Sequence, residues 1–510
     1  MKAADLPLHY NAVDILERNL LRRPDKTALL SAEREITYGD LAAEVNRTGN
    51  ALSAMGVHFG ETVAILAPDS VEWVATYFGT IKIGAIALSL NTMLTPEEFQ
   101  LMLEDSRAKV LVCHEMYRAV VEQVRGDVPS LKHVVEIGTP EYRAWLDAQS
   151  DKLEATVTHR EDICCLNYSS GTTGEPKGIP HAHKDLPLTA QNWGVNILGL
   201  TESDRTFAGA KLFFTFGTGG NLIFPFYVGA SAVLLAGSPR ITANVLDTVH
   251  RFKPTVLYNA PTGYAMALAE KELTTKWDLS SLRICVSAGE SLPAPLWEQW
   301  KERTGLDIID GIGSTENYHI FLSNRPGDIR PGSSGKPFDG YELKLADEDG
   351  NDVPAGEAGN LWVKGESAAL CYLHQYDRSR GAFRGEWLVT GDKYSIDEDG
   401  YYWHSGRSDD MLKVGGIWVS PVEVESMLLR HDAVLECAVV GVADGDGLVK
   451  PLAYVKLNEG FSGDDDTAAQ LIGHCATNMA AYKRPRRIEF VPELPKTATG
   501  KIQRFKLRSS

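Results

Sequence analysis

Apolar and polar residues alternate along much of the chain in a pattern that predicts strands and helices in turn. Segments with apolar residues at helical spacing lie at 69–84, 241–252 and 294–303. Short apolar runs typical of buried strands lie at 62–67, 85–90, 109–113, 163–169, 255–260, 282–290 and 307–311. This alternation favours an α/β fold with layered, largely parallel sheets.

The pattern changes after about residue 330. Residues 333–365 contain short strand-like runs with Asp-Gly and Gly-Asn turns, which predict a β-rich subdomain. A last region begins near residue 409 and contains helical segments at 421–431 and 467–479 and strands at 434–442 and 452–457. We therefore expect a large N-terminal domain, residues 1–408, and a small α+β domain, residues 409–510.

Composition and charge narrow the class of protein. The net charge of −17 argues against a nucleic-acid-binding protein, which usually has a basic face. We expect no signal peptide, because the N-terminus has no basic start followed by an apolar core. We expect no membrane association, because the longest apolar run, 222–237, is too short to span a bilayer. This run predicts a strand pair or a strand after a helix. The seven cysteines form no Cys-x-x-Cys pair, which favours reduced thiols in a cytoplasmic protein.

A loop rich in glycine and hydroxyl residues, 168-YSSGTTGEPKG-178, is the strongest candidate for chemistry. Its glycines let backbone N–H groups approach an anion, and Lys177 adds a positive charge. The loop does not match the common G-x-x-x-x-G-K-[ST] phosphate loop, because Pro176 stands where that pattern needs glycine. A flexible surface turn is the alternative interpretation.

Further polar segments are weak signals when each is taken alone. The segment 310-DGIGSTE-316 ends on a carboxylate suited to a divalent cation that bridges phosphates. An aspartate in 390-TGD-392 is suited to ribose hydroxyls, although a hairpin turn explains it as well. The segments 405–420 and 495-PKTATGKIQR-504 carry charges among glycines, and solvated linkers or tails are the alternative for both.

Taken together and in this order, the segments resemble those of the adenylate-forming enzymes. This superfamily contains acyl- and aryl-CoA synthetases, adenylation domains of peptide synthetases and luciferases, and the resemblance covers essentially the whole chain. It implies a reaction in two halves, in which a carboxylate attacks the α-phosphate of ATP and a thiol then displaces AMP. Cations and hydrogen-bond donors must neutralise the charge that develops in the first half.

The resemblance assigns cofactor roles to individual positions. The β- and γ-phosphates of ATP would lie against Ser169, Ser170, Gly171, Thr172, Thr173, Gly174 and Lys177. Thr315 and Glu316 would contact the α-phosphate and Mg²⁺, with Glu316 as the metal ligand. Adenine would lie against Gly289, Glu290, Ser291, Asp310, Gly311 and Ile312, and ribose would contact Asp392 and Arg407.

The resemblance also assigns a moving catalytic part to the small domain. Lys501 would bridge the acid and the α-phosphate during adenylation, which suits a mobile point charge. Asp409 would be the hinge about which the domain turns. Lys413, Gly415 and Gly416 would then enter the site for thioester formation with coenzyme A.

The class of acid substrate is indicated by a closer resemblance to benzoate-type aryl-CoA ligases. The segments that carry this resemblance are 211–220, 318–330 and 406–425. The implied pocket positions are Phe214, Thr215, Phe216, Gly217, Tyr258, Ala260, Gly313, Asn317, His319 and Ile320. Phe216 and Tyr258 are suited to hold an aromatic ring, and Lys413 and His319 to reach its carboxylate, although core packing is an equal alternative for each aromatic residue. Asn317 departs from the family, whose members have an apolar residue there. Hydroxybenzoate and aminobenzoate are therefore candidate substrates beside benzoate.

The leading hypothesis is an ATP- and Mg²⁺-dependent aryl-CoA ligase, acting as a monomer or homodimer on an aromatic acid. An enzyme that loads the acid onto a carrier protein is the alternative, and the two differ in their thiol acceptor. A non-catalytic member of the superfamily is disfavoured because Lys177, Glu316, Asp392, Arg407 and Lys501 are all present.

Overall fold

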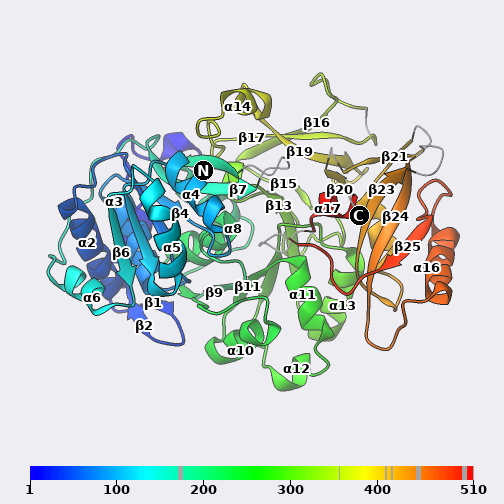
Figure 1. Ribbon diagram of the computed structural model, residues 1–510, viewed down its shortest axis with the longest axis horizontal. Coiled ribbons are helices and arrows are strands. Elements are labelled where there is room, and N and C mark those ends of the chain that lie inside the picture. The colour runs from blue at the N-terminus through cyan, green and yellow to red at the C-terminus, as the bar shows by residue number, and fades with distance from the viewer. Residues whose placement is uncertain are drawn as a thin grey trace.

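The computed structural model describes residues 1–170, 176–354, 356–407, 410–414, 417–443, 449–496 and 502–508. The side chains of Ser170, Lys413, Ile417, Trp418 and Ala443 are also outside the description. Figure 1 shows the N-terminal two thirds of the chain on the left and below, a β-rich part above, and the C-terminal region on the right.

One sheet of the large domain has the strand order β6-β5-β3-β4-β7-β8. Its strands are parallel except for β8, which pairs antiparallel with β7. Alternate residues of β3 face opposite layers, because Val63 and Ile65 pack with α3 whereas Ala64 and Leu66 pack with α4 and α5. The strands are β3 (Thr62–Leu66), β4 (Ile86–Ser89), β5 (Val110–His114), β6 (His133–Ile137), β7 (Ile163–Ser170) and β8 (Pro176–Ala182), and the helices near them are α2 (Tyr38–Ala54), α3 (Val71–Lys82), α4 (Pro96–Asp105), α5 (Arg118–Val124) and α6 (Pro140–Asp147).

A second sheet has the order β15-β14-β13-β12-β11-β9-β10-β1-β2, with a parallel centre and antiparallel edges. On one face, Leu257 packs with α10, α11 and α13, while Tyr258 faces the first sheet. The strands are β1 (Thr27–Leu30), β2 (Glu35–Thr37), β9 (Arg205–Ala208), β10 (Ser231–Val233), β11 (Val256–Asn259), β12 (Ile284–Ser287), β13 (Ile308–Gly313), β14 (Ile320–Ser323) and β15 (Lys336–Pro337), and the helices are α10 (Thr242–Phe252), α11 (Pro261–Ala269), α12 (Leu273–Lys276) and α13 (Ala294–Thr304).

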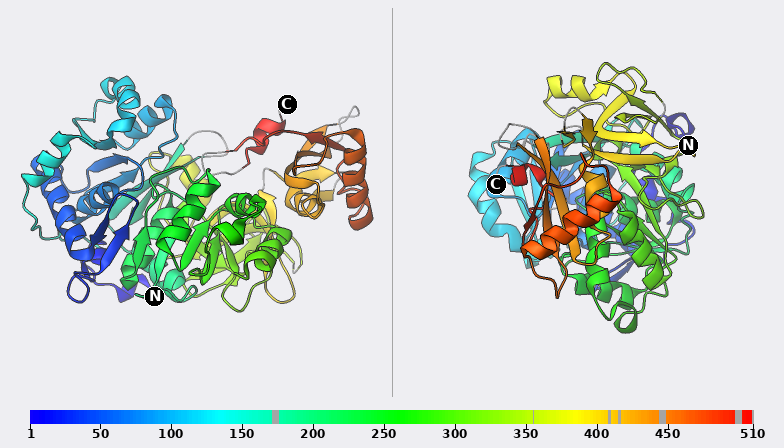
Figure 2. Two further views of the ribbon diagram at one scale, coloured as in Figure 1. Left: turned by 90° about the horizontal axis from the view of Figure 1, so that it is seen from below. Right: turned by 90° about the vertical axis from the view of Figure 1, so that its right-hand side faces the viewer.

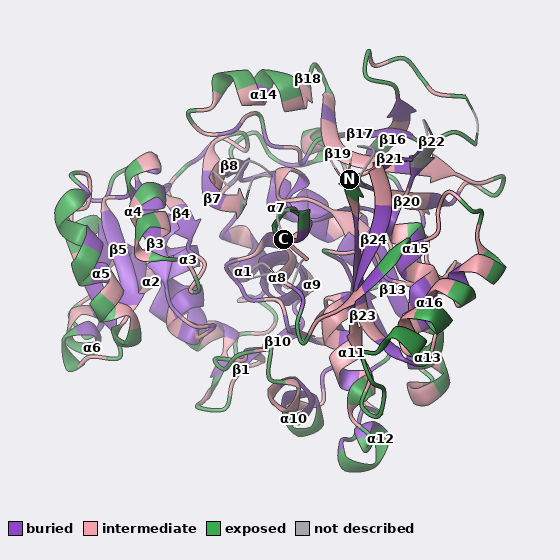
Figure 3. Cartoon of the chain, turned by 45° about the vertical axis from the view of Figure 1, so that its right-hand side comes forward, coloured by how far each residue is buried: buried purple, intermediate pink, exposed green. Residues whose placement is uncertain are grey.

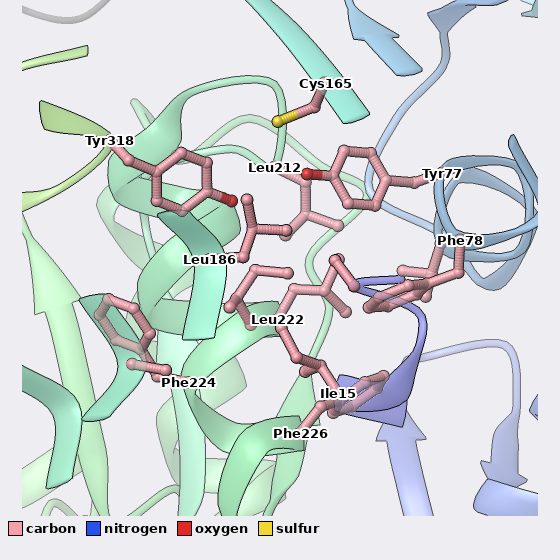
Figure 4. Packing of buried hydrophobic residues seen from close by; sticks show 14 of the residues in the cluster. Ile15, Tyr77, Phe78, Cys165, Leu186, Leu212, Leu222, Phe224, Phe226 and Tyr318 are labelled. Carbon is pink, nitrogen blue, oxygen red and sulfur yellow. The ribbon is translucent and has the colours of Figure 1, made fainter. Parts of the chain in front are cut away.

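The layer between the two sheets is the main hydrophobic core. It contains α3 together with the short helices α1 (Asp14–Glu17), α7 (Asp185–Thr189), α8 (Thr215–Thr218) and α9 (Phe224–Val228). Figure 4 shows Tyr77 of α3 and Cys165 of β7 meeting Leu186, Leu212 and Tyr318 in this layer. Figure 3 shows the same central elements as buried. Burial of this layer joins both sheets into one domain, since each sheet supplies one of its faces.

A β-rich part follows, with the order β16-β17-β19-β18 and β20 paired to β19. Its elements are β16 (Tyr341–Ala346), β17 (Gly359–Gly365), α14 (Tyr376–Ala382), β18 (Phe383–Arg384), β19 (Trp387–Ile396) and β20 (Tyr402–Arg407). The C-terminal region stands at one end of the molecule in Figure 2. It contains β21 (Leu412–Val414), β22 (Ile417–Val419), α15 (Pro421–Leu428), β23 (Val434–Ala443), β24 (Val449–Leu457), α16 (Asp465–Asn478), β25 (Arg487–Phe490) and α17 (Arg504–Arg508).

The predicted fold class is confirmed in its main parts. The layered sheets, the β-rich subdomain and the small α+β region all lie where the sequence indicated them. The apolar run 222–237 forms helix α9 followed by strand β10, so the strand-after-helix prediction is correct. The C-terminal hydrophobic clusters use only residues from Leu412 onward within the described chain, which supports a separate domain, although the boundary at 408 stays a prediction. Among the described residues, no helix has both the length and the apolar character needed to cross a bilayer.

Candidate active site

A cavity of about 1630 Å³ lies where the large domain, the β-rich part and the C-terminal region meet. The large domain and the β-rich part supply Lys177, Glu290, Glu316 and Asp392 to its wall. From the C-terminal region come Glu425, Lys496, Ile502 and Arg504. The cavity therefore collects charged residues that are far apart in the sequence.

The described ends of the segment 168–178 lie on two antiparallel strands, β7 and β8. Strand β7 places Ser169 opposite Lys177 of β8, and both residues line the cavity. Beside this pair, the Tyr168 hydroxyl donates to Asp105 Oδ2 over 2.6 Å. Burial, together with the nearby Arg378 and Arg407, lowers the pKa of Lys177 from its usual value, although Glu316 opposes this.

The turn after β13 places Thr315 and Glu316 at the cavity wall. The Ser314 hydroxyl caps this turn by accepting from the Asn317 N–H over 3.2 Å. Below the turn, His181 Nε2 lies 2.7 Å from the Thr315 carbonyl oxygen. The Tyr372 hydroxyl donates to Glu316 Oε1 over 2.9 Å.

The donor set at Glu316 fits a magnesium ion that is held through a nucleotide. In the described part of the chain, no three histidine, cysteine or acidic residues gather to form a metal cage. One or two carboxylates are the usual protein contribution to Mg²⁺, because phosphates and waters supply its other ligands.

The two predicted ribose residues lie on paired strands. Asp392 of β19 is paired in register with Arg407 of β20, and the Arg407 Nη1 to Asp392 Oδ1 distance is 3.5 Å. Gly391 has φ +79°, and a Cβ there would lie 2.9 Å from Arg407 Nη2, so glycine suits this turn. His404 Nδ1 lies 2.6 Å from Ser291 Oγ and connects the two segments.

The rest of the predicted adenine segment lines the same part of the cavity, as Gly289, Glu290, Gly311 and Ile312 do. Glu290 accepts from the Thr262 hydroxyl over 3.0 Å. Asp310 is different, because its side chain is buried and burial raises the pKa of its carboxyl well above the usual value. An adenine contact would therefore come from the Gly311 side of β13.

The predicted acid pocket is a cluster of aromatic rings in the central layer. The Phe216 ring lies 5.8 Å from Tyr258 at an interplanar angle of 78°, and 5.5 Å from the His319 ring. Gly219 and Gly220 leave room for the rings of His319 and Tyr258, since a Cβ at either position would come within 2.8 Å of them. Phe214 packs edge-on against Phe213 at 4.5 Å.

His319 is a buried neutral imidazole. Burial lowers its pKa to about 3. Its Nε2 lies 3.3 Å from the Phe216 carbonyl oxygen, which can only accept, so Nε2 carries the proton. Its Nδ1 is then an acceptor, and it has no hydrogen-bond partner among the described residues.

Asn317 is fully buried, so it does not face solvent. Its Oδ1 also lacks a partner in the described chain, while its Nδ2 lies 3.4 Å from Ser314 Oγ. The remaining predicted pocket residues lie in or next to four other elements. Thr215 and Gly217 lie in α8, Ala260 precedes α11, Gly313 ends β13, and Ile320 begins β14.

Several predicted site residues lie outside the described residues. These are Gly171, Thr172, Thr173, Gly174, Asp409, Gly415, Gly416 and Lys501, together with the side chains of Ser170 and Lys413. Their roles stay predictions. The nearest described neighbours of Lys501, Lys496 and Ile502, line the cavity.

Sequence reasoning missed Tyr372, Arg378, His404 and His181. Tyr372, Arg378 and His404 line the cavity, and His181 supports the Thr315 turn from below. His181 lies four residues after Lys177 on the same strand, so the hairpin motif itself could have indicated it. Tyr372 and Arg378 lie in a segment with no distinctive pattern, and only the fold brings them to the site.

Comparison with known proteins identifies the family. The sequence profile described as "AMP-binding enzyme" matches residues 16–373, and the profile described as "AMP-binding enzyme C-terminal domain" matches residues 423–501. The chain belongs to the AMP-binding enzymes. Both profiles fall on the parts of this AMP-binding enzyme that enclose the cavity.

Individual relatives resemble this AMP-binding enzyme over its full length. The crystal structure of the anthranilate CoA ligase AuaEII in complex with anthranoyl-AMP is 63% identical, with a TM-score of 0.98, and the match covers 100% of this chain and 98% of that one. A benzoate CoA ligase from Burkholderia xenovorans LB400 is 41% identical, with a TM-score of 0.92, over 98% of this chain and 100% of that one. The benzoate–CoA ligase of Thauera aromatica is 46% identical over 100% of this chain and 97% of its own length.

Proposed function

We propose that the protein is an AMP-forming aryl-CoA ligase whose preferred acid is 2-aminobenzoate (anthranilate). It joins a benzoate-type acid to AMP with release of pyrophosphate, and then transfers the acyl group to the thiol of coenzyme A with release of AMP. The aryl-CoA ligase activity agrees with the full-length similarity to benzoate and anthranilate CoA ligases. The preference for an amino group on the aromatic ring is the finer part of the proposal.

The charged residues of the cavity suit the first half of the reaction. Lys177 and the hydroxyl of Ser169 would hold the leaving pyrophosphate, and Asp392 would accept from the ribose hydroxyls. Glu316 would hold Mg²⁺, which when bound offsets the charge of the phosphates. Lys501 would bridge the carboxylate and the α-phosphate, since a long flexible ammonium side chain can reach both anions.

The unpartnered acceptor on His319 is the observation that carries the preference for a donor on the ring, and the 63% identity to the anthranilate CoA ligase AuaEII favours an amine as that donor. A buried acceptor without a donor costs about 1–3 kcal/mol, and Nδ1 of His319 is such an atom among the described residues. An amino group on the ring is a donor that would satisfy it, whereas benzoate would leave it unpaired. The Tyr258 hydroxyl, also buried without a partner in the described chain, offers a second polar contact.

The test is CoA-dependent AMP release with anthranilate, benzoate, 4-hydroxybenzoate and a short fatty acid. We expect the highest kcat/KM for anthranilate and the lowest for the fatty acid, and no thioester product when CoA is omitted. A preference for the fatty acid would overturn the aryl-CoA ligase. Equal kcat/KM for anthranilate and benzoate would overturn only the finer proposal.

A substitution at His319 tests the role of its Nδ1 atom in the same assay. His319→Leu removes the imidazole but keeps an apolar side chain of similar size. We expect the ratio of kcat/KM for anthranilate over benzoate to fall by about tenfold, because one unpaired acceptor is worth about 1–3 kcal/mol. An unchanged ratio would show that His319 does not recognise the amine.

A further inference from the structure

The connection 369–375, between β17 and α14, is hydrogen-bonded to two segments that line the cavity. These segments are the Thr315–Glu316 turn and strand β8. The Ala369 N–H donates to the Glu316 carbonyl oxygen over 2.7 Å, and the Leu373 N–H donates to the Gly178 carbonyl oxygen over 2.8 Å. Gln375 Nε2 donates to the Pro176 carbonyl oxygen over 3.0 Å. The connection therefore spans the gap between the Thr315–Glu316 turn and strand β8.

Tyr372 lies in the middle of this connection and contacts the charged side chain on each side. Its hydroxyl donates to Glu316 Oε1 over 2.9 Å. Its ring lies under the Lys177 ammonium, with Nζ 4.7 Å from the ring centroid. One side chain thus contacts both the lysine expected to hold phosphate and the carboxylate expected to hold the metal.

The Tyr372 side chain is itself firmly held. It is only 4% exposed and packs against the Phe383 ring at 5.2 Å. Its backbone N–H donates to Ser379 Oγ over 2.9 Å, which ties it to α14. Burial, followed by the charge of Glu316, raises the pKa of the Tyr372 hydroxyl above its usual value, so the hydroxyl stays a donor.

We propose that Tyr372 is a positioning residue for the triphosphate site, which keeps Lys177 and Glu316 in place for magnesium-bound ATP. The proposal rests on the proposed function, because it assumes that this cavity binds ATP. The hydroxyl occupies Oε1 of Glu316 and leaves Oε2 for the metal. The ring contacts the Lys177 ammonium without removing its charge, so the charge stays available to phosphate.

The two contacts can be separated by substitution. Tyr372→Phe removes the hydroxyl and keeps the ring, so it breaks only the link to Glu316. We expect it to weaken binding of ATP in the presence of Mg²⁺ by about tenfold, as the loss of a hydrogen bond to a charged group implies. Binding of ATP in the presence of EDTA should stay near the wild-type value, because the Lys177 contact remains.

Isothermal titration calorimetry without any acid measures both affinities. The matched control is Tyr376→Phe, since Tyr376 is 75% exposed four residues further along and should change neither affinity. Wild-type affinity of Tyr372→Phe for magnesium-bound ATP would overturn the proposal. An equal loss with and without Mg²⁺ would also overturn it, because the effect would then not pass through Glu316.

A double-mutant cycle guards against a general loss of stability. In a Glu316→Ala background, Tyr372→Phe should weaken binding of magnesium-bound ATP no further, because the acceptor of the Tyr372 hydroxyl is already gone. A fully additive loss would mean that Tyr372 acts on the fold alone. These measurements need no aryl acid, so a failed substrate assay and a failed role for Tyr372 are distinguishable.

Discussion

At the scale of single residues, His181 carries a buried positive charge beneath the active site. Its Nδ1 lies 2.9 Å from Asp185 Oδ2, and its Nε2 lies 2.7 Å from the Thr315 carbonyl oxygen. A carboxylate and a carbonyl both accept, so both ring nitrogens must donate and the ring is an imidazolium. Burial alone would lower the pKa of His181, but the hydrogen bond and charge of Asp185 outweigh burial and raise the pKa above 6.5.

This geometry predicts a pH-dependent contribution of His181 to stability. Because its pKa is raised in the folded state, the stabilisation is fully present below about pH 6.5 and is lost as the pH rises through the folded value. The gap in Tm between wild type and His181→Gln should therefore be largest near pH 6 and should narrow toward pH 9. Differential scanning fluorimetry across this range measures it, and a gap that does not change with pH would contradict the charged state.

Sequence reasoning placed the residues of the active site with uneven success. Lys177 and Glu316 stand in motifs that are readable in one dimension, and both line the cavity as expected. Tyr372 is 56 residues from its partner Glu316, and His181 is 134 residues from Thr315. Contacts over such separations depend on how the sheets pack. The spacing of residues within a short segment does not predict them.

At the scale of elements, the segment 210–218 forms one wall of the predicted acid pocket. It is a compact turn held by hydrogen bonds between its own residues. The Thr218 hydroxyl donates to the Phe214 carbonyl oxygen over 2.9 Å, and the Phe214 N–H donates to the Lys211 carbonyl oxygen over 3.0 Å. A Cβ at Gly217 would lie 2.1 Å from the Lys211 carbonyl oxygen. Glycine is therefore required at 217 by the close approach of the backbone.

Gly217→Ala should disturb this wall more than the nucleotide site. We expect a loss of about 1–3 kcal/mol of stability from overpacking. We also expect the KM for anthranilate to rise severalfold while the KM for ATP changes little. Steady-state kinetics together with Tm checks both effects, and an unchanged KM for the acid would remove 210–218 from the pocket.

The control for this substitution is Gly473→Ala. Gly473 lies inside α16, and a Cβ there would meet no atom within 4 Å. Alanine should favour the helix by about 0.5–1 kcal/mol and leave both KM values unchanged. The same change of side chain is thus expected to have opposite effects on stability at the two positions.

At the scale of the whole molecule, the C-terminal region completes the wall of the cavity together with the large domain and the β-rich part. Arg504 donates to both oxygens of Glu425 over 2.9 and 2.8 Å, and both residues line the cavity. Glu290 and Asp392 face it from the large domain and the β-rich part. We propose that a catalytic residue carried by this region serves one half-reaction and not the other, because a turn of the domain would change which of its residues face the cavity.

Lys501→Ala tests this separation of the two half-reactions. Pyrophosphate exchange, which reports adenylation, should fall by at least about 100-fold, as the loss of one group that stabilises developing charge implies. Thioester formation from supplied anthranoyl-AMP should be retained. Lys483→Ala is the control, because Lys483 forms a surface ion pair with Glu423 and such pairs contribute little. Loss of both half-reactions in Lys501→Ala would contradict the assigned role.

The sequence by itself determined the layered α/β class, the order of its parts and the motif residues such as Lys177, Glu316 and Asp392. These features are local, because hydrophobic periodicity and short polar loops are written in consecutive residues. Only the tertiary structure decided that Tyr372 joins Lys177 to Glu316, that His181 supports Thr315, and that His319 is neutral with a free acceptor among the described residues. Protonation states and partners depend on burial and on neighbours from distant segments, and packing alone sets both.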